Sequence, residues 1–337
     1  MQKLRKILWP FSLLYGGVVK IRNIFFDRGI FRSFSFDTPV ICVGNLSVGG
    51  TGKTPMVEYL LRLLQPGYKV ATLSRGYKRK SKGFVLAGPE SGVESLGDEP
   101  CQYHAKFPGV MVAVDADRVH GIHNLLQAEV APDVIILDDA FQHRKVQAGL
   151  NIVLTAYDKL YVHDMFLPAG DLRDDTLQAR RAHIIIVTKC PEDLGEEEKE
   201  QIVRSLAPGG EQQIFFTAIA YGNSINSREE TLPLNSWKEA HFTLVTGIAN
   251  PAPLVEFLRT RGMDFEHLNF PDHHNFSEDE LYKLRQKSRI LTTEKDFMRL
   301  QDKVDHIFFL GIRTAFLFGD GEKFNAVVSA YVSGGDK

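Results

Sequence analysis

The sequence predicts an α/β fold, with a doubly wound parallel sheet, a second and smaller α/β domain, and an amphipathic helix at the N-terminus. Three observations predict this architecture. Apolar runs recur along the chain and are nearly continuous, as in parallel strands that are covered on both faces. Helical stretches lie between several of these runs. A glycine-rich turn joins the first run to a helix, which is typical of a P-loop NTPase-type domain.

Residues 1–36 predict a basic amphipathic segment that contacts a membrane surface. Seven basic residues accompany one acidic residue, Asp27, so the segment carries a charge of +6. The uncharged run 7–19 has thirteen residues, which is short of the roughly 20 that span a bilayer. A helix lying in the membrane interface fits this pattern. Its apolar positions are Leu4, Ile7, Leu8, Phe11, Tyr15, Val18, Ile21 and Phe25.

The same segment has two other interpretations. Its charged start and apolar run resemble a signal peptide, but Lys20 and Arg22 follow at once and no small-residue cleavage site appears in the sequence. The helix can also pack on the core of its own protein, and that alternative stays open.

Residues 37–220 predict the larger domain. Strands that alternate with helices indicate parallel strands joined by crossover helices. The expected strands are 38–45, 69–74, 109–115, 133–139, 151–156 and 183–189, and the expected helices are 117–128 and 195–206.

A polar, turn-rich stretch at 221–240 predicts a linker. The alternation then resumes, so residues 241–337 predict a smaller C-terminal α/β domain. Its expected elements are strands at 241–249, 288–296 and 306–311, a helix at 251–261 and a final helix.

The composition is that of a globular protein with room for two domains. The chain has 337 residues, of which 44% are apolar and 24% charged. Its net charge of −2 gives no global field of the kind that marks a nucleic-acid binder, so we expect no nucleic-acid partner. The three cysteines are odd in number and lack metal-ligand spacing, which favours a reduced, cytosolic setting.

The stretch SVGGTGKT, residues 47–54, has the composition of a loop that wraps phosphates. Its glycines let backbone N–H groups approach phosphate oxygens at the positive end of the following helix. Lys53 would reach the terminal phosphates and Thr54 would bind Mg²⁺. The strict motif begins with glycine, whereas this chain has Ser47 at that position. The alternative interpretation is that the stretch is a chance glycine turn without a bound phosphate. The expected nucleotide-binding residues are Ser47, Val48, Gly49, Gly50, Thr51, Gly52, Lys53 and Thr54.

A second signature follows at the end of an expected strand, where VIILDD places Asp138 and Asp139. A carboxylate at the tip of the strand beside a phosphate loop holds Mg²⁺ directly or through water. A pair of solvated acids at a turn is the alternative. Guanine-specific NTPases carry Asn-Lys-x-Asp after a late strand, whereas this chain reads TKCP at 188–191. The missing aspartate favours ATP as the nucleotide.

Further polar groups lie on expected loops. GDEP places Asp98 before an expected helix, and DADR places Arg118 just after a strand. LPAGDLRD carries Arg173, and FPDHH carries His273 in the second domain. Individually, each has an ordinary interpretation as a helix cap or a surface charge. Together they supply what kinase chemistry requires: a carboxylate that accepts a hydroxyl proton, a nearby histidine, and arginines that neutralise phosphate.

Taken in order, these motifs resemble those of the tetraacyldisaccharide 4′-kinase family. The matching segments are VGNLSVGGTGKTP, LSRGY, GDEP, ILDDAFQHR, LPAGDLRD, TGIANP, FPDHH and TTEKD. The resemblance implies an ATP- and Mg²⁺-dependent lipid kinase that phosphorylates the 4′-hydroxyl of a tetraacyldisaccharide 1-phosphate in lipid A biosynthesis. It also implies an active site between two α/β domains and an N-terminal helix that contacts the membrane.

The resemblance implies roles for individual residues as well. Asp98 matches the family's proposed catalytic carboxylate, His273 matches its partner, and Lys53 completes the catalytic set. The expected metal ligands are Thr54, Asp138 and Asp139, and the expected ligands of substrate or phosphate are Arg75, Arg118, Gln142, His143 and Arg173.

The expected partners are a lipid disaccharide and an anionic membrane, contacted peripherally at the cytoplasmic face of the bacterial inner membrane. The sequence gives no sign of an obligate protein partner. Two alternatives remain. A P-loop kinase of a soluble metabolite would have no need of the basic, aromatic N-terminus. An NTPase switch that delivers a metal or a partner protein would be expected to carry metal-binding cysteines or histidine tracts, which the sequence lacks.

Overall fold

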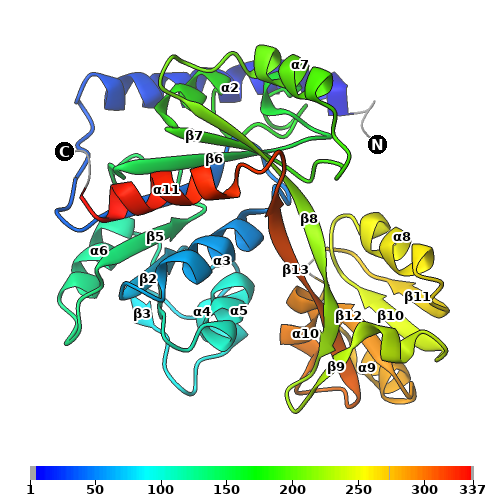
Figure 1. The fold of residues 1–337 in the computed structure, drawn as a ribbon. Helices are drawn as coiled ribbons and strands as arrows, with labels where there is room; N and C mark the ends of the chain where they lie inside the picture. Colours follow the sequence, from blue (N-terminus) through cyan, green and yellow to red (C-terminus); the bar gives the residue numbers. More distant parts are fainter. Residues whose placement is uncertain (1–4, 273, 335–337) are drawn as a thin grey trace.

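The computed structural model describes residues 5–272 and 274–334 and contains two α/β units (Figure 1). The predicted fold class is confirmed. The chain starts with η1 (Lys6–Leu8) and α2 (Trp9–Asp27). The first unit then contains β1 (Val40–Asn45), α3 (Lys53–Leu64), β2 (Val70–Ser74), β3 (Val85–Leu86), α4 (Val93–Leu96), α5 (Asp98–Lys106), β4 (Met111–Val114), α6 (Arg118–Leu126), β5 (Val134–Asp138), β6 (Leu150–Ala156), η2 (Tyr161–His163), η3 (Thr176–Arg181), β7 (Ile184–Thr188) and α7 (Glu196–Leu206).

Two long strands, β8 (Gln213–Asn226) and β13 (Ile307–Phe316), join this unit to the second. The second unit contains β9 (Thr231–Pro233), η4 (Leu234–Trp237), β10 (Phe242–Thr246), α8 (Ala252–Thr260), β11 (Phe265–Asn269), α9 (Glu278–Arg285), β12 (Ile290–Thr293) and α10 (Glu294–Leu300). Helix α11 (Gly321–Val332) follows β13.

The larger sheet has the strand order β3-β4-β2-β5-β1-β6-β7-β8, and its strands are parallel except for β3. Each strand expected in the larger domain is present within one or two residues of its predicted bounds, as are the helices α6 and α7. Strand β1 lies between β5 and β6, so the chain winds to one side of β1 first and to the other later. The carboxyl end of β1 is therefore the topological switch point, where open α/β sheets bind their ligands.

Apolar side chains cover both faces of this sheet. Met56 and Leu60 of α3 pack on one face together with Phe324 of α11. Ile122 of α6 and Ile202 of α7 belong to the core on the other face. The near-continuous apolar strands predicted from the sequence are thus explained, because each strand contributes side chains to both cores.

Strands β8 and β13 run side by side as an antiparallel ribbon between the units (Figure 1). The start of β8 pairs with β7, and residues 217–226 pair with β13. The prediction of a linker at 221–240 therefore differs from the structure. This stretch contains the end of β8, together with β9 and η4. The polar composition there reflects a ribbon whose residues are mostly half-exposed, so the strand lacks an apolar pattern.

The second unit has the strand order β11-β10-β12-β13, and these strands are all parallel. The expected strand 288–296 ends earlier, at Thr293, because the Thr293 side chain caps α10 by accepting the backbone N–H of Asp296 at 3.2 Å. The expected helix 251–261 corresponds to α8.

Helix α11 does not belong to the second unit, although it was predicted within the domain 241–337. Phe324 and Val328 of α11 are fully buried in the core of the first unit, and Tyr331 exchanges hydrogen bonds of 3.0 Å with the backbone of Val40. The ribbon of β8 and β13 explains this return, since β13 brings the chain back to the larger sheet before α11 begins (Figure 1).

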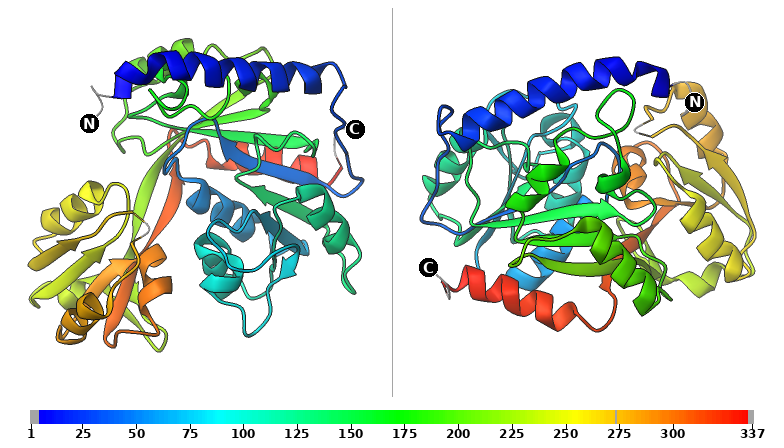
Figure 2. Two further views of the ribbon diagram at one scale, coloured as in Figure 1. Left: turned by 180° about the vertical axis from the view of Figure 1, so that it is seen from behind. Right: turned by 90° about the horizontal axis from the view of Figure 1, so that it is seen from above.

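Helix α2 lies along the outer surface of the first unit (Figure 2). Its packed face is narrow and mostly small or polar, consisting of Ser12, Gly16, Val19 and Asn23. The opposite face carries large apolar side chains that are more than half exposed: Trp9, Phe11, Leu13, Leu14, Val18 and Ile21. Within residues 5–272 and 274–334, we find no helix that combines the length and the apolar character needed to cross a membrane.

Candidate active site

Three carboxyl ends of the larger sheet meet at the switch point. The glycine-rich loop follows β1, Asp138 ends β5, and Ser74 ends β2. Strand β5 pairs in parallel with both β1 and β2, so these ends are neighbours. The strand order therefore brings together the residues predicted to bind the nucleotide and the metal.

The loop uses glycine where its backbone adopts left-handed conformations. Gly49 has φ of 110° and Gly52 has φ of 83°, values that side chains with a Cβ rarely adopt. The fully buried Asn45 stabilises the turn, because its Nδ2 donates to the Thr51 hydroxyl at 2.8 Å.

Ser47, which stands where the strict phosphate-loop motif has glycine, lies where the loop contacts the LPAGDLRD segment. Ser47 is buried and forms an antiparallel bridge with Leu172. The Val48 N–H donates to the carbonyl of Asp171 at 2.8 Å. The LPAGDLRD segment thus runs beside the loop and fixes its first residues.

Asp139 is held between two cations at the centre of the site. Lys53 Nζ lies 3.5 Å from Asp139 Oδ1. Arg173 donates through Nη2 to Oδ1 at 2.7 Å and through Nη1 to Oδ2 at 3.1 Å. Burial raises the pKa of Asp139, but Lys53 and Arg173 outweigh burial and hold that pKa well below its usual range. Asp139 is consequently an anion at neutral pH, and it aligns two cations that a phosphate can bind.

Asp138 lies in a different environment from its neighbour. It is almost completely buried, and its Oδ2 accepts from Tyr103 at 3.2 Å and from Ser74 at 3.4 Å. Its Oδ1 finds no hydrogen-bond partner among the described residues. Burial, and then the charges of Asp139 and Glu99, raise the pKa of Asp138 to about 7. A buried carboxylate oxygen of this kind suits a divalent cation.

The residues expected around the substrate lie at the same edge, in different settings. Arg118 is 2% exposed and donates to the Asp115 carbonyl at 2.8 Å. Arg75 is exposed directly after β2. Gln142 donates to the Asn45 carbonyl at 2.6 Å. Burial, and then the charge of Arg118, lower the pKa of His143 to about 4, so its ring is neutral near pH 7.

Three further residues of this region were not identified from the sequence. Asn45 connects the loop to Arg173, which donates to its Oδ1. Tyr103 is fully buried, and its hydroxyl interacts with Asp138 and Thr54. Lys189 has φ of 58°, and its Nζ would lie 3.7 Å from a Cβ added at Gly50. Lys189 is the lysine of TKCP, the stretch whose missing aspartate favours ATP over GTP. Its lysine carried no separate prediction.

Asp98 opens α5 and faces the second unit. Both of its carboxylate oxygens accept hydrogen bonds from the guanidinium of Arg299, which belongs to α10. The two side chains are 12% and 10% exposed, so the ion pair is largely shielded from solvent. Asp98 is thus placed at the junction of the two units. His273 lies outside the described residues.

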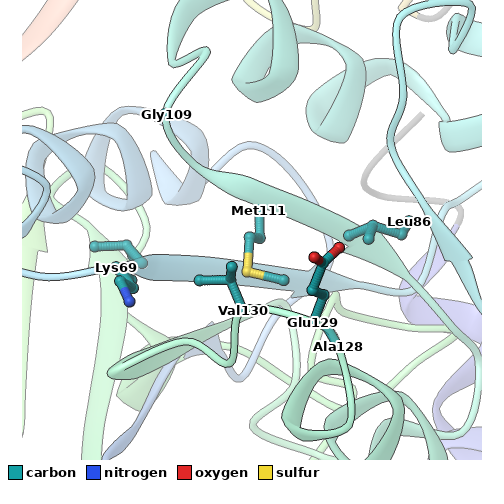
Figure 3. Close-up of a pocket in the computed structure, with 8 residues that line it drawn as sticks. Lys69, Leu86, Gly109, Met111, Ala128, Glu129 and Val130 are labelled. Carbon is teal, nitrogen blue, oxygen red and sulfur yellow. The ribbon is translucent and has the colours of Figure 1, made fainter.

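The structure has a cavity at one edge of each sheet. One of about 470 Å³ is formed at the carboxyl ends of β10 and β11, lined by Ile248, Ala249, Pro251, Asn269, Phe270, Pro271 and Asp272. It lies beside the switch point of the smaller sheet, which falls between β10 and β12. The other, of about 330 Å³, includes Met111 and Val130 and is shown in Figure 3. It lies at the amino ends of β2 and β4, the opposite edge from the phosphate loop.

Comparison with known proteins gives a consistent result. A family model described as tetraacyldisaccharide-1-P 4′-kinase matches residues 4–333. The tetraacyldisaccharide 4′-kinase of Flavobacterium johnsoniae is 50% identical, over 98% of both chains. The enzyme of the same name from Bacteroides thetaiotaomicron is 45% identical, over 98% of this chain and 94% of its own.

A solved structure resembles the whole chain as well. It is the crystal structure of LpxK from Aquifex aeolicus in complex with ATP, with a TM-score of 0.78 and 32% sequence identity. The match covers 98% of this chain and 99% of that one.

Proposed function

The chain belongs to the tetraacyldisaccharide-1-P 4′-kinase family and is an ATP-dependent kinase of lipid A biosynthesis; from this premise we propose how its residues carry the reaction. It phosphorylates the 4′-hydroxyl of a tetraacyldisaccharide 1-phosphate. The observation that carries this function is the family match across nearly the whole chain. The contacts of Lys53 and Arg173 with Asp139 beside the phosphate loop support this function.

ATP is bound by the phosphate loop in this proposal. Backbone N–H groups at the start of α3 face the phosphates, and Lys53 exchanges its contact with Asp139 for the terminal phosphate. Arg173 stays close enough to neutralise the transferred group. Thr54, Asp138 and Asp139 would hold Mg²⁺, and the unpartnered Oδ1 of Asp138 supports this assignment. When bound, Mg²⁺ neutralises charge that develops on the phosphate oxygens.

Asp98 accepts the proton of the sugar hydroxyl in this proposal, with His273 as its partner. The metal-site acids are weaker bases when they bind Mg²⁺, whereas Asp98 belongs to α5 at the junction of the units. Its pairing with Arg299 does not block the role, because a carboxylate offers about four acceptor positions and a bidentate arginine uses only two. Arg75, Arg118, Gln142 and His143 complete the site as ligands of substrate or phosphate.

Acceptor dependence of ATP turnover tests this function. We expect ADP to form at an appreciable rate only when tetraacyldisaccharide 1-phosphate is added, because the base acts on the acceptor hydroxyl. The measurement is ADP release with and without the lipid, and with a soluble disaccharide as the control acceptor. Equal turnover without acceptor would favour an NTPase switch, and efficient use of the soluble sugar would favour a kinase of a soluble metabolite.

We propose a peripheral contact with an anionic membrane at the cytoplasmic face of the inner membrane, and the exposed face of α2 supports the membrane contact. Its large apolar side chains point outward, whereas several basic residues of α2 and of the stretch before it bind within the protein. Arg5 pairs with Asp171 at 2.7 Å, Lys20 lies 3.6 Å from Asp175, and Arg22 donates to the carbonyl of Gln142. Apolar burial is therefore expected to dominate over charge.

Polar substitution of this face should weaken vesicle binding. We expect Phe11→Ser combined with Leu14→Ser to lower binding to phosphatidylglycerol-containing vesicles by about tenfold or more, since burying each side chain contributes about 1.5–3 kcal/mol. The measurement is co-sedimentation at constant salt. Val130→Ser, at an apolar residue that is 51% exposed on another surface, is the matched control. Undiminished sedimentation of the α2 variant would place membrane contact elsewhere.

A further inference from the structure

Helices α5 and α10 are joined at both of their ends. They come from different units, and they lie antiparallel: Asp98 at the start of α5 pairs with Arg299 near the end of α10. At the opposite end, Lys106, the last residue of α5, binds Glu294, the first residue of α10, at 2.6 Å. The helix that carries the proposed base is thus fixed at both termini by one helix of the second unit.

The Lys106 end of this contact also includes the phosphate-loop helix. Lys106 Nζ binds Glu58 Oε2 of α3 at 2.7 Å. Glu58 is 1% exposed, and it accepts further hydrogen bonds from Gln102 and Arg62, both at 2.8 Å. Because α3 begins at Lys53, this buried carboxylate lies less than two helical turns from the lysine of the phosphate loop.

Glu294 is buried beside Lys106. It is 7% exposed. Burial, and then the nearby Glu58, raise the pKa of Glu294, whereas Lys106 lowers it. The Lys106 ammonium therefore binds two buried acidic side chains from different units, Glu58 and Glu294. Such a buried network is rigid when every group has a partner, and removing one partner is costly.

Helix α10 is itself anchored in the second unit. Asp296 is fully buried, and its Oδ2 accepts the N–H of Gly247 at 2.8 Å and the hydroxyl of Thr293 at 2.7 Å. Gly247 directly follows β10. The position of α10 is consequently tied to the second sheet, and its two ion pairs connect that sheet to α5, which is otherwise anchored in the first unit by Tyr103.

We propose that Lys106 and Glu294 are positioning residues for phosphoryl transfer. With Glu58, they lock the end of α5 between α3 and α10, so that Asp98 at its start is held at a fixed place relative to the phosphate loop. This inference rests on the proposed role of Asp98 as the base. Neither residue binds the nucleotide or the acceptor; both act through the placement of α5.

Glu294→Gln tests the proposal, because it keeps the shape of the side chain and leaves Lys106 paired with Glu58. We expect kcat to fall about tenfold or more, since small displacements of a catalytic group are costly. KM for ATP should stay within about twofold, because the nucleotide contacts remain. Glu94→Gln is the matched control: Glu94 pairs with Lys80 on the surface, where the side chains are 76% and 73% exposed, and this variant should behave as wild type.

A variant cycle with Asp98→Ala separates positioning from general destabilisation. If Glu294 acts through Asp98, adding Glu294→Gln to Asp98→Ala should leave kcat unchanged. Losses that multiply, or an unimpaired Glu294→Gln enzyme, would overturn the proposal. Near-normal kcat for Asp98→Ala alone would instead overturn the role of Asp98. If Glu294→Gln lowers the melting temperature, Glu294→Asp is tested in its place. A folded Glu294→Asp enzyme with slow turnover would support the positioning role. Normal turnover of that enzyme would contradict it.

Discussion

Lys53→Ala should nearly abolish phosphoryl transfer while leaving the protein folded. The lysine contacts Asp139 at 3.5 Å and begins α3, so in our proposal it reaches the charge that develops on the transferred phosphoryl group. Loss of such a transition-state contact typically costs ~10²–10³ in rate. The measurement is kcat with saturating ATP and acceptor, together with a melting curve.

A matched lysine shows whether the effect is specific. Lys238→Ala removes an exposed lysine in the second unit, and we expect it to retain wild-type kcat. Turnover near the wild-type level in Lys53→Ala would remove the phosphate loop from the mechanism.

Asp98→Ala should cause the second large loss, because a general base contributes typically 10²–10⁴ in rate. We expect kcat to fall within that range while KM for ATP barely changes, since Asp98 belongs to α5 and not to the phosphate loop, and it pairs with Arg299. The measurement is a pair of saturation curves, one for each substrate. Asp302→Asn, at a surface aspartate that is 67% exposed, is the control. A change confined to the affinity for ATP or Mg²⁺ would assign Asp98 to metal binding.

The proposed partnership of Asp98 with His273 has its own signature. His273→Ala should also lower kcat strongly, and the double variant should be little slower than the slower single variant, because residues that act as one unit are not additive. Two losses that multiply would show that the residues act independently.

The geometry of the proposed phosphate loop was predictable because it is local in sequence. Residues 47–54 carry a motif whose geometry depends on adjacent glycines, and Asp138 and Asp139 end an apolar strand. Once β5 is taken as a neighbour of β1, the contact of Lys53 with Asp139 follows from the strand order.

The contacts between the units could not be predicted in the same way. Arg299 and Glu294 read as ordinary charges of a short helix, and their partners Asp98 and Lys106 are about two hundred residues away in sequence. Their roles depend on how the ribbon of β8 and β13 sets the second unit against α5. The β8 strand of that ribbon was itself hidden, because its half-exposed residues lack an apolar pattern, whereas the start of β13 was predicted as the strand 306–311.

The sequence predicted an apolar face of α2 that contacts a membrane, but periodicity left open the alternative in which that face packs on the protein's own core. The helix packs through small and polar residues, such as Gly16, where an added Cβ would approach the ring of Phe166 to 2.8 Å. A helix in a soluble core normally buries its apolar stripe, and only the structure shows that this one presents much of its apolar surface outward.

The most direct test of the account follows the γ-phosphate itself. Enzyme, ATP labelled in the γ-phosphate, Mg²⁺ and tetraacyldisaccharide 1-phosphate are incubated, and the position of the label in the product is determined. The account predicts a labelled phosphate on the 4′-oxygen, formed in step with ADP by the wild type and almost absent with Lys53→Ala or Asp98→Ala. Label that appears as inorganic phosphate, or on the disaccharide at wild-type rates with those variants, would contradict it.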